Sequence, residues 1–77
     1  MSIQVKYFAS MRERMGRAEE SVSTTEALTV AEIWSRVSGD QTLPPNTLVA
    51  INMEYSGLSA MVKAGDEVAF FPPVTGG

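Results

Sequence analysis

The chain contains no cysteine and no histidine, and these two absences exclude most kinds of active site. Without cysteine there is no disulfide scaffold, thiolate nucleophile, iron–sulfur cluster or cysteine zinc site. Without histidine there is no imidazole base, and the commonest transition-metal ligand is missing. Its 77 residues predict one domain, too small to enclose a substrate pocket beside its own core. We therefore expect no catalysis by this chain alone, no bound metal and no bound cofactor.

The sequence also lacks an excess of positive charge and any long hydrophobic run. Six lysine and arginine residues against nine aspartate and glutamate residues give a net charge of −3, which disfavours nucleic acid and anionic membranes as partners. No apolar run approaches the ~20 residues that span a bilayer. The first residues do not have the layout of a signal peptide, so we predict a cytoplasmic protein.

Alternation of polar and apolar residues predicts the strands. Residues 2–7 and 67–71 each place an apolar side chain at every second position, which is the pattern of a half-buried strand. Residues 48–51 are short, apolar and partly β-branched, and predict a buried strand. Residues 18–24 are mostly polar and predict an exposed strand at the edge of the sheet.

Two capping boxes predict two helices. The stronger one begins at Thr29 and precedes residues 30–37, whose apolar side chains follow the i, i+3, i+4, i+7 spacing of one helix face. The weaker one begins at Ser10 and predicts a helix of about two turns that ends at Gly16.

The predicted order of elements indicates an α+β fold. One main helix with one apolar stripe must pack on one face of a mixed sheet, and a β-grasp roll fits this order with the first and last strands at the centre. A ferredoxin-like fold fits less well, because it needs two long amphipathic helices. We divide the chain into a β-grasp domain, residues 1–71, and a flexible functional tail, residues 72–77.

The tail has an unusual composition. Pro72 and Pro73 have no backbone N–H, so they end the last strand and stiffen the exit from the fold. Gly76 and Gly77 have no Cβ and can enter a narrow channel of a partner. If the Gly77 carboxylate is the reacting group, it needs activation as an acyl phosphate or acyl adenylate by an enzyme that supplies ATP and Mg²⁺, since this sequence has no phosphate-binding loop. A frayed terminus is the alternative interpretation.

Aromatic residues on the outer face of the sheet predict a partner interface. Phe8 and Phe71 fall on the outward parity of strands that we place at the centre of the sheet, and Tyr55 follows a predicted turn close by. A register slip of one residue would instead bury either phenylalanine. Arg12 lies on the polar face of the short helix and can form an ion pair with a partner.

Three segments resemble a known family. GDEVAFFPPVTGG at 65–77, VKYFASMRE at 5–13 and AINMEY at 50–55 resemble the small, sulfur-carrying subunit of molybdopterin synthase, the MoaD-type proteins. The resemblance extends over essentially the whole chain, and its C-terminal segment is highly specific. It implies a ubiquitin-like β-grasp fold.

The resemblance also implies a mechanism. An E1-like adenylyltransferase would use ATP and Mg²⁺ to adenylate the C-terminal carboxylate, and a sulfur donor protein would convert it to a thiocarboxylate. The tail would then enter the large subunit of molybdopterin synthase and give its sulfur to cyclic pyranopterin monophosphate. The active enzyme of this family is a heterotetramer, and its catalytic basic residues are expected on the large subunit.

Individual residues carry over from the family by position. Gly77 corresponds to the glycine that bears the acyl group and the sulfur, and Gly76 corresponds to the glycine before it, which has no side chain. The remaining tail residues match the segment that enters the partner's channel: Pro72, Pro73, Val74 and Thr75. The family's hydrophobic partner surface matches Phe8, Tyr55 and Phe71.

Three alternatives stay open at this point. The chain can be a sulfur carrier for thiamine synthesis or tRNA thiolation, because such carriers share the fold and the terminal glycines. It can be a ubiquitin-like modifier joined to lysine residues through Gly77. It can also be an interaction module whose tail has no function.

Overall fold

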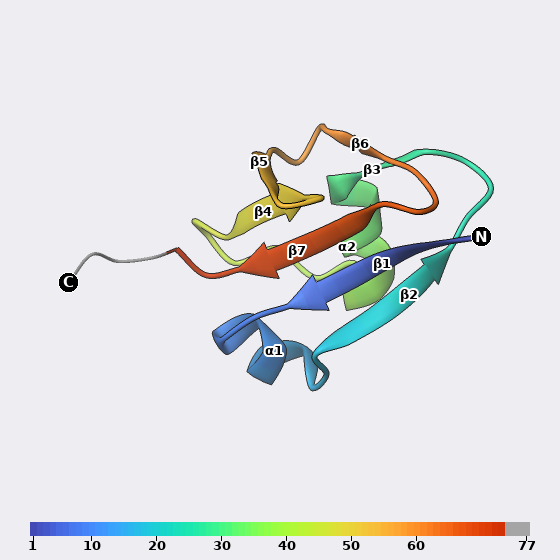
Figure 1. Ribbon diagram of the computed structural model, residues 1–77. Helices are drawn as coiled ribbons and strands as arrows, with labels where there is room; N and C mark the ends of the chain where they lie inside the picture. The colour runs from blue at the N-terminus through green and yellow to red at the C-terminus, as the bar shows by residue number, and fades with distance from the viewer. Residues whose placement is uncertain (74–77) are drawn as a thin grey trace.

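The computed structural model describes residues 1–73 of the chain, and Figure 1 gives its arrangement. Its elements in chain order are β1 Ser2–Tyr7, α1 Ser10–Met15, β2 Glu19–Ser23, β3 Leu28–Thr29, α2 Val30–Ser38, β4 Leu48–Ile51, β5 Glu54–Ser56, β6 Met61–Val62 and β7 Glu67–Phe71. In Figure 1, α2 lies behind the sheet, and α1 lies at the end of β1. This is the α+β, β-grasp arrangement that the sequence predicts.

The main sheet has the strand order β2-β1-β7-β4-β5. The first and last strands pair in parallel, with Val5 opposite Val68, and every other neighbouring pair is antiparallel. The predicted central position of these two strands is therefore confirmed, as is the edge position of β2. Because β7 is the middle strand, the C-terminal segment leaves from the most firmly paired part of the sheet.

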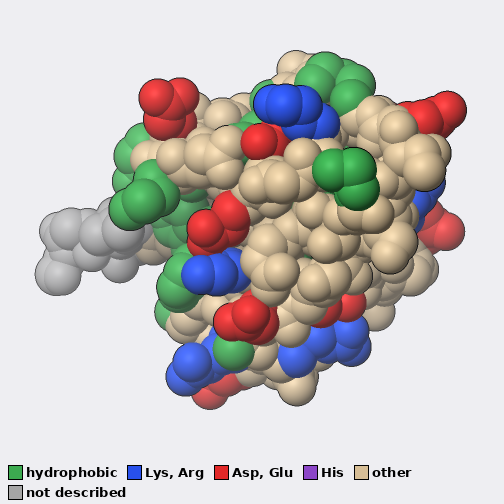
Figure 2. Space-filling model, turned by 45° about the vertical axis from the view of Figure 1, so that its right-hand side comes forward, with side chains coloured by type: hydrophobic (Ala, Val, Ile, Leu, Met, Phe, Trp, Pro, Cys, Tyr) green, Lys and Arg blue, Asp and Glu red, His purple; other side chains and the backbone are tan. Residues whose placement is uncertain are grey.

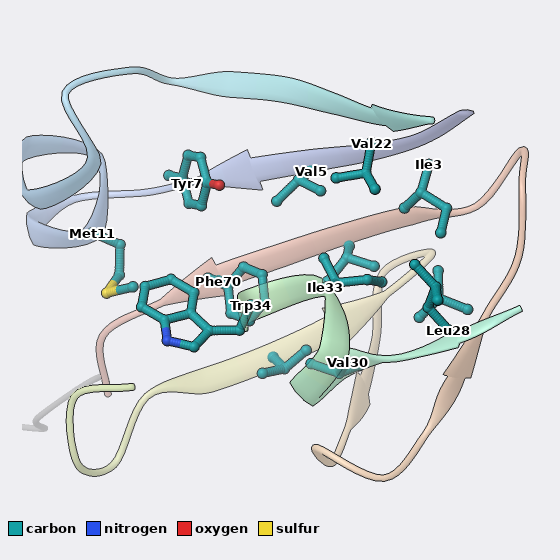
Figure 3. Packing of buried hydrophobic residues seen from close by; sticks show 13 residues of the cluster. Ile3, Val5, Tyr7, Met11, Val22, Leu28, Val30, Ile33, Trp34 and Phe70 are labelled. Carbon is teal, nitrogen blue, oxygen red and sulfur yellow. The ribbon is translucent and has the colours of Figure 1, made fainter. Parts of the chain in front are cut away.

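The hydrophobic core lies between the sheet and α2. The inward residues of β1 and β7 are buried, and Figure 3 shows several of them facing the helix: Ile3, Val5, Tyr7 and Phe70. The ring of Phe70 lies 6.2 Å from that of Tyr7 and 5.2 Å from that of Trp34, measured between centroids. The indole N–H of Trp34 donates to the Gln41 carbonyl at 2.7 Å, so the buried polar atom is satisfied.

The predicted capping box of α2 is confirmed. The Thr29 hydroxyl accepts a hydrogen bond from the Glu32 backbone N–H at 3.1 Å, and the Glu32 carboxylate accepts one from the Thr29 backbone N–H at 3.1 Å. Gly39 ends the helix in the left-handed region, with φ 70°. Both ends of α2 thus follow from local sequence signals.

The predicted capping box of α1 is wrong. The residue before the helix is Ala9, with φ 51°, and no side chain caps the N-terminus, because Ser10 is already the first helical residue. The carbonyls of Phe8 and Ala9 accept from the N–H groups of Met11 and Arg12 at 3.0 Å, so the backbone itself satisfies the first turn. The predicted end at Gly16 is confirmed.

A short second ladder was not predicted. Leu28 pairs with Val62, and both side chains are buried at the edge of the core. Each strand of this ladder has two residues, which is too short for a period-two pattern to appear. The division into residues 1–71 and 72–77 stays a prediction.

Candidate functional site

The face of the sheet opposite α2 has small residues at its centre. The strand register places Ala50 beside both Tyr55 and Ala69, and Ala69 in turn beside Lys6. Two neighbouring methyl side chains thus stand between the larger side chains of Lys6 on β1 and Tyr55 on β5. The result is a depression in the middle of an otherwise continuous surface.

This depression, which we call the sheet hollow, has a volume of about 630 Å³. It is lined mainly by apolar atoms, and its residues are Lys6, Phe8, Ala50, Met53, Tyr55, Glu67, Ala69 and Phe71. Figure 2 shows hydrophobic side chains gathered along one side of the molecule, with acidic and basic side chains beside them. An exposed apolar hollow with a polar border is typical of a protein-binding surface.

The three predicted aromatic residues meet in the sheet hollow. Phe8 is 49% exposed and Tyr55 is 75% exposed, whereas Phe71 is partly buried. The rings of Tyr55 and Phe71 lie 5.9 Å apart between centroids, tilted by 47°. The outward parity of Phe8 and Phe71 is therefore confirmed, and no register slip buries them.

Lys6 and Glu67 form an ion pair at the border of the sheet hollow. The Lys6 Nζ lies 3.2 Å from the Glu67 Oε1, and both side chains are more than a third exposed. Such an exposed pair contributes at most about 1 kcal/mol to folding. Its charges cancel locally, so the surface around the aromatic rings favours an apolar partner rather than a strongly charged one.

The β4–β5 turn adds a residue that the sequence analysis missed. Met53 lines the sheet hollow and is 93% exposed. This position does not follow from a local sequence pattern, because Met53 reaches the face through a left-handed backbone, with φ 71°, that composition does not reveal.

The base of the tail lies next to this face. Pro72 and Pro73 directly follow Phe71 and line a second, smaller pocket of about 270 Å³. The other residues that line it come from α1 and from the loop before β4: Ser10, Met11, Arg14, Pro44, Pro45 and Thr47. The other predicted reacting and channel-entering residues lie outside the described residues: Val74, Thr75, Gly76 and Gly77.

The sequence of the chain matches a known protein family. The model of the ThiS family matches residues 5–77, which is nearly the whole chain. The chain belongs to the ThiS family. Together with the named relatives described next, this match confirms the resemblance that the three sequence segments carry.

Two relatives with curated names and one solved structure are also similar to this chain. This ThiS-family chain is 40% identical to the molybdopterin synthase sulfur carrier subunit of Haemophilus influenzae and 37% identical to that of Escherichia coli. Each alignment covers 97% of this chain and 99% of the relative. Among solved structures, SAMP1 from Haloferax volcanii, a small archaeal modifier protein, is 29% identical, with a TM-score of 0.83 and complete coverage of both chains.

Arg12 is not part of the sheet hollow of this ThiS-family protein. Its side chain is exposed on α1, and it is absent from the residues that line the hollow. The structure thus brings Phe8, Tyr55 and Phe71 together and leaves Arg12 apart. Its ion pair with a partner stays a prediction.

The shifted titratable groups of this ThiS-family chain are structural. Burial raises the pKa of Tyr7 well above its ordinary value, helped by the hydrogen bond that its hydroxyl donates to Glu20 at 2.5 Å. Hydrogen bonds from the Lys63 backbone and the Asn52 side chain lower the pKa of Asp66.

Within residues 1–73, no group of three or more acidic, cysteine or histidine residues can hold a metal ion. No helix in the same part of the chain is long and apolar enough to cross a membrane.

Proposed function

We propose that this chain is a sulfur carrier for molybdopterin synthesis and that the Gly77 carboxylate is its reacting group. The observation that carries the proposal is the placement of the sheet hollow beside the strand from which the tail leaves. A partner that takes up the tail meets the aromatic face at the same time. Nearly full-length identity to two molybdopterin synthase sulfur carrier subunits supports this function.

The chemistry begins with activation of the carboxylate. A Gly77 carboxylate oxygen attacks the α-phosphorus of ATP, pyrophosphate leaves, and an acyl adenylate forms. A hydrosulfide equivalent from a sulfur donor protein then attacks the carbonyl carbon, AMP leaves, and a thiocarboxylate results. An E1-like adenylyltransferase supplies the Mg²⁺ and the cationic groups that this chain lacks.

The transfer of the sulfur takes place in a complex with the large subunit of molybdopterin synthase. The large subunit covers the sheet hollow and receives the thiocarboxylate. Its sulfur forms a bond to a carbon of cyclic pyranopterin monophosphate and displaces an oxygen substituent there. Water then cleaves the acyl–sulfur bond, which restores the Gly77 carboxylate and leaves the sulfur on the pterin. Both relatives are named as subunits of molybdopterin synthase, which supports a second chain in the active enzyme. The catalytic groups for sulfur transfer belong to the large subunit in this proposal.

Deletion of Gly77 tests the proposal. We expect the truncated chain to lose all sulfur transfer and to keep its thermal unfolding midpoint, because the deleted residue follows β7 by six positions. Intact mass spectrometry of the full chain, purified from its own cell, is expected to find an oxygen-to-sulfur mass increase localised to Gly77. A truncated chain that still transfers sulfur, or that unfolds, would contradict this assignment.

A protein-modifier role is the second candidate, because the chain shares its fold and 29% identity with SAMP1. In that case the activated Gly77 carboxyl forms an amide with a lysine Nζ of another protein. The same mass spectrometry separates the two, since a modifier gives lysine-linked adducts and a carrier gives a free thiocarboxylate. Incubation with the large subunit and the pterin precursor then tests the pathway.

A further inference from the structure

The turn between β4 and β5 holds a bulky residue in a conformation that favours glycine. Ile51 pairs with Glu54, so the loop contains only Asn52 and Met53, with φ 49° and 71°. A two-residue hairpin turn with both φ values positive prefers Asn-Gly, because a side chain crowds the left-handed region. Asn52 fits this preference, and Met53 does not.

Hydrogen bonds to the start of β7 hold this turn in place. The Asn52 backbone N–H donates to the Glu67 carbonyl at 2.8 Å, and its side-chain oxygen accepts from the Glu67 N–H at 2.9 Å. Its side-chain nitrogen donates to the Asp66 carboxylate at 3.1 Å. These three bonds fix residue 52, so the backbone of residue 53 has little freedom to leave the left-handed region.

The Met53 side chain contributes little to the folding stability of the free chain, although its backbone is strained. It is 93% exposed and is not part of the buried core. It nevertheless lines the sheet hollow beside Tyr55. A strained residue that packing does not require is more readily explained by a contact that forms in a complex.

The length of the tail limits where the partner can lie. Four residues follow Pro73, and a fully extended chain covers at most about 3.6 Å per residue. A site that receives Gly77 therefore lies within roughly 14 Å of Pro73. Phe71 is two residues before Pro73 and lines the sheet hollow, so the protein that receives the tail borders the hollow at its Phe71 end. Met53 lies toward the Glu67 end, because its neighbour Asn52 bonds to Glu67, and a partner that covers the whole hollow reaches it.

We propose that Met53 contributes to the affinity for the large subunit that receives the tail, by packing against an apolar side chain of that subunit. The inference rests on the sulfur-carrier function proposed above and adds a residue to its interface. A methionine suits this position because its unbranched, polarisable side chain adapts to the shape of the surface that it meets. The strained turn holds the Cα in place while the side chain adjusts.

Three substitutions at one position separate contact from folding. We expect Met53→Ala and Met53→Gly to weaken binding of the purified large subunit about tenfold, because each removes most of an apolar side chain that the complex buries. Calorimetric titration of the full chain measures this affinity. Met53→Leu is expected to stay within about threefold of the parent, because it keeps the apolar volume. Met53→Gly should also leave the thermal midpoint unchanged or raised, since glycine relieves the left-handed strain.

Phe71→Ala is the control that separates this inference from the proposed function. Weaker binding by Phe71→Ala together with unchanged binding by all three Met53 variants would overturn the role of Met53 alone. Unchanged binding by both would show that the large subunit does not use the sheet hollow, and the docking proposal itself would fail. A Met53→Gly variant whose midpoint falls in step with its affinity would assign Met53 a structural role and refute the inference.

Discussion

Phe70 and Phe71 are neighbours in sequence with opposite surroundings, and this pair tests the assignment of the two sheet faces. Phe70 is 0% exposed and packs against Tyr7 and Trp34 in the core. Phe71 points to the other face, where it lines the sheet hollow and contacts Tyr55. Replacing each by alanine removes the same side chain from two different environments.

The structure sets the size of the two effects. Phe70→Ala leaves a cavity in a close-packed core and is expected to cost about 3–5 kcal/mol of unfolding free energy. In a domain of this size each kcal/mol lowers the thermal midpoint by about 4–8 °C, so we expect a drop of at least about 12 °C. Phe71→Ala opens no internal cavity and is expected to cost about 1–2 kcal/mol, from the area it shares with its neighbours on the sheet.

We expect Phe71→Ala to weaken binding of the partner more than Phe70→Ala does, which is the opposite of the order for stability. A central aromatic residue of an interface commonly contributes 2 kcal/mol or more, so Phe71→Ala is expected to weaken the complex with the large subunit about 30-fold or more. Calorimetric unfolding of the free chain and titration of the folded variant measure the two quantities separately. A Phe71→Ala variant that unfolds as readily as Phe70→Ala, or binds as tightly as the parent, would refute the outward assignment.

Two further predictions concern the fold itself. Thr29→Ala should lower the unfolding free energy by about 1 kcal/mol, measured by denaturant titration, because it removes the α2 cap; Thr29→Ser should retain most of it. Acid should destabilise the protein, because hydrogen bonds hold the pKa of Glu32 below its ordinary value of 4.5 and that of Asp66 below 3.8. Each carboxylate stabilises the fold fully above these unfolded values, and its contribution is lost as pH falls through the lower folded value. Thermal midpoints that stay constant from pH 6 to well below 4 would contradict this.

Most of the fold could be predicted from local patterns because those patterns report burial directly. Ile3, Val5 and Tyr7 alternate with polar residues and are buried, and the same parity places Phe8 outside. The stripe and cap of α2 are local as well, since the Thr29 and Glu32 groups that bond are three residues apart. The alternation of inward and outward residues along the strands was enough to place Phe8 and Phe71 on the outer face.

The features that sequence could not predict depend on contacts between distant segments. The sheet hollow exists because Ala50 and Ala69, nineteen positions apart in sequence, are direct neighbours across β4 and β7. Met53 joins it because hydrogen bonds between Asn52 and residues 66 and 67 fix the turn. The capping error at Ser10 is different, because it is local: the backbone turn at Ala9 supplies carbonyls that accept from the first N–H groups of α1, which the Ser10 hydroxyl was expected to do.

The parallel pairing of β1 with β7 has a consequence for how the protein is made. Among the strands of this sheet, the two at its centre are the first and the last to be synthesised, so the core cannot close before β7 has been made. Contacts of such long sequence separation also slow folding, because the intervening loop must close before they form. β7 is followed directly by the tail residues, so a chain with a complete tail is also one that has every strand of its sheet. An activating enzyme that binds both the sheet hollow and the tail would therefore load only finished, folded carriers.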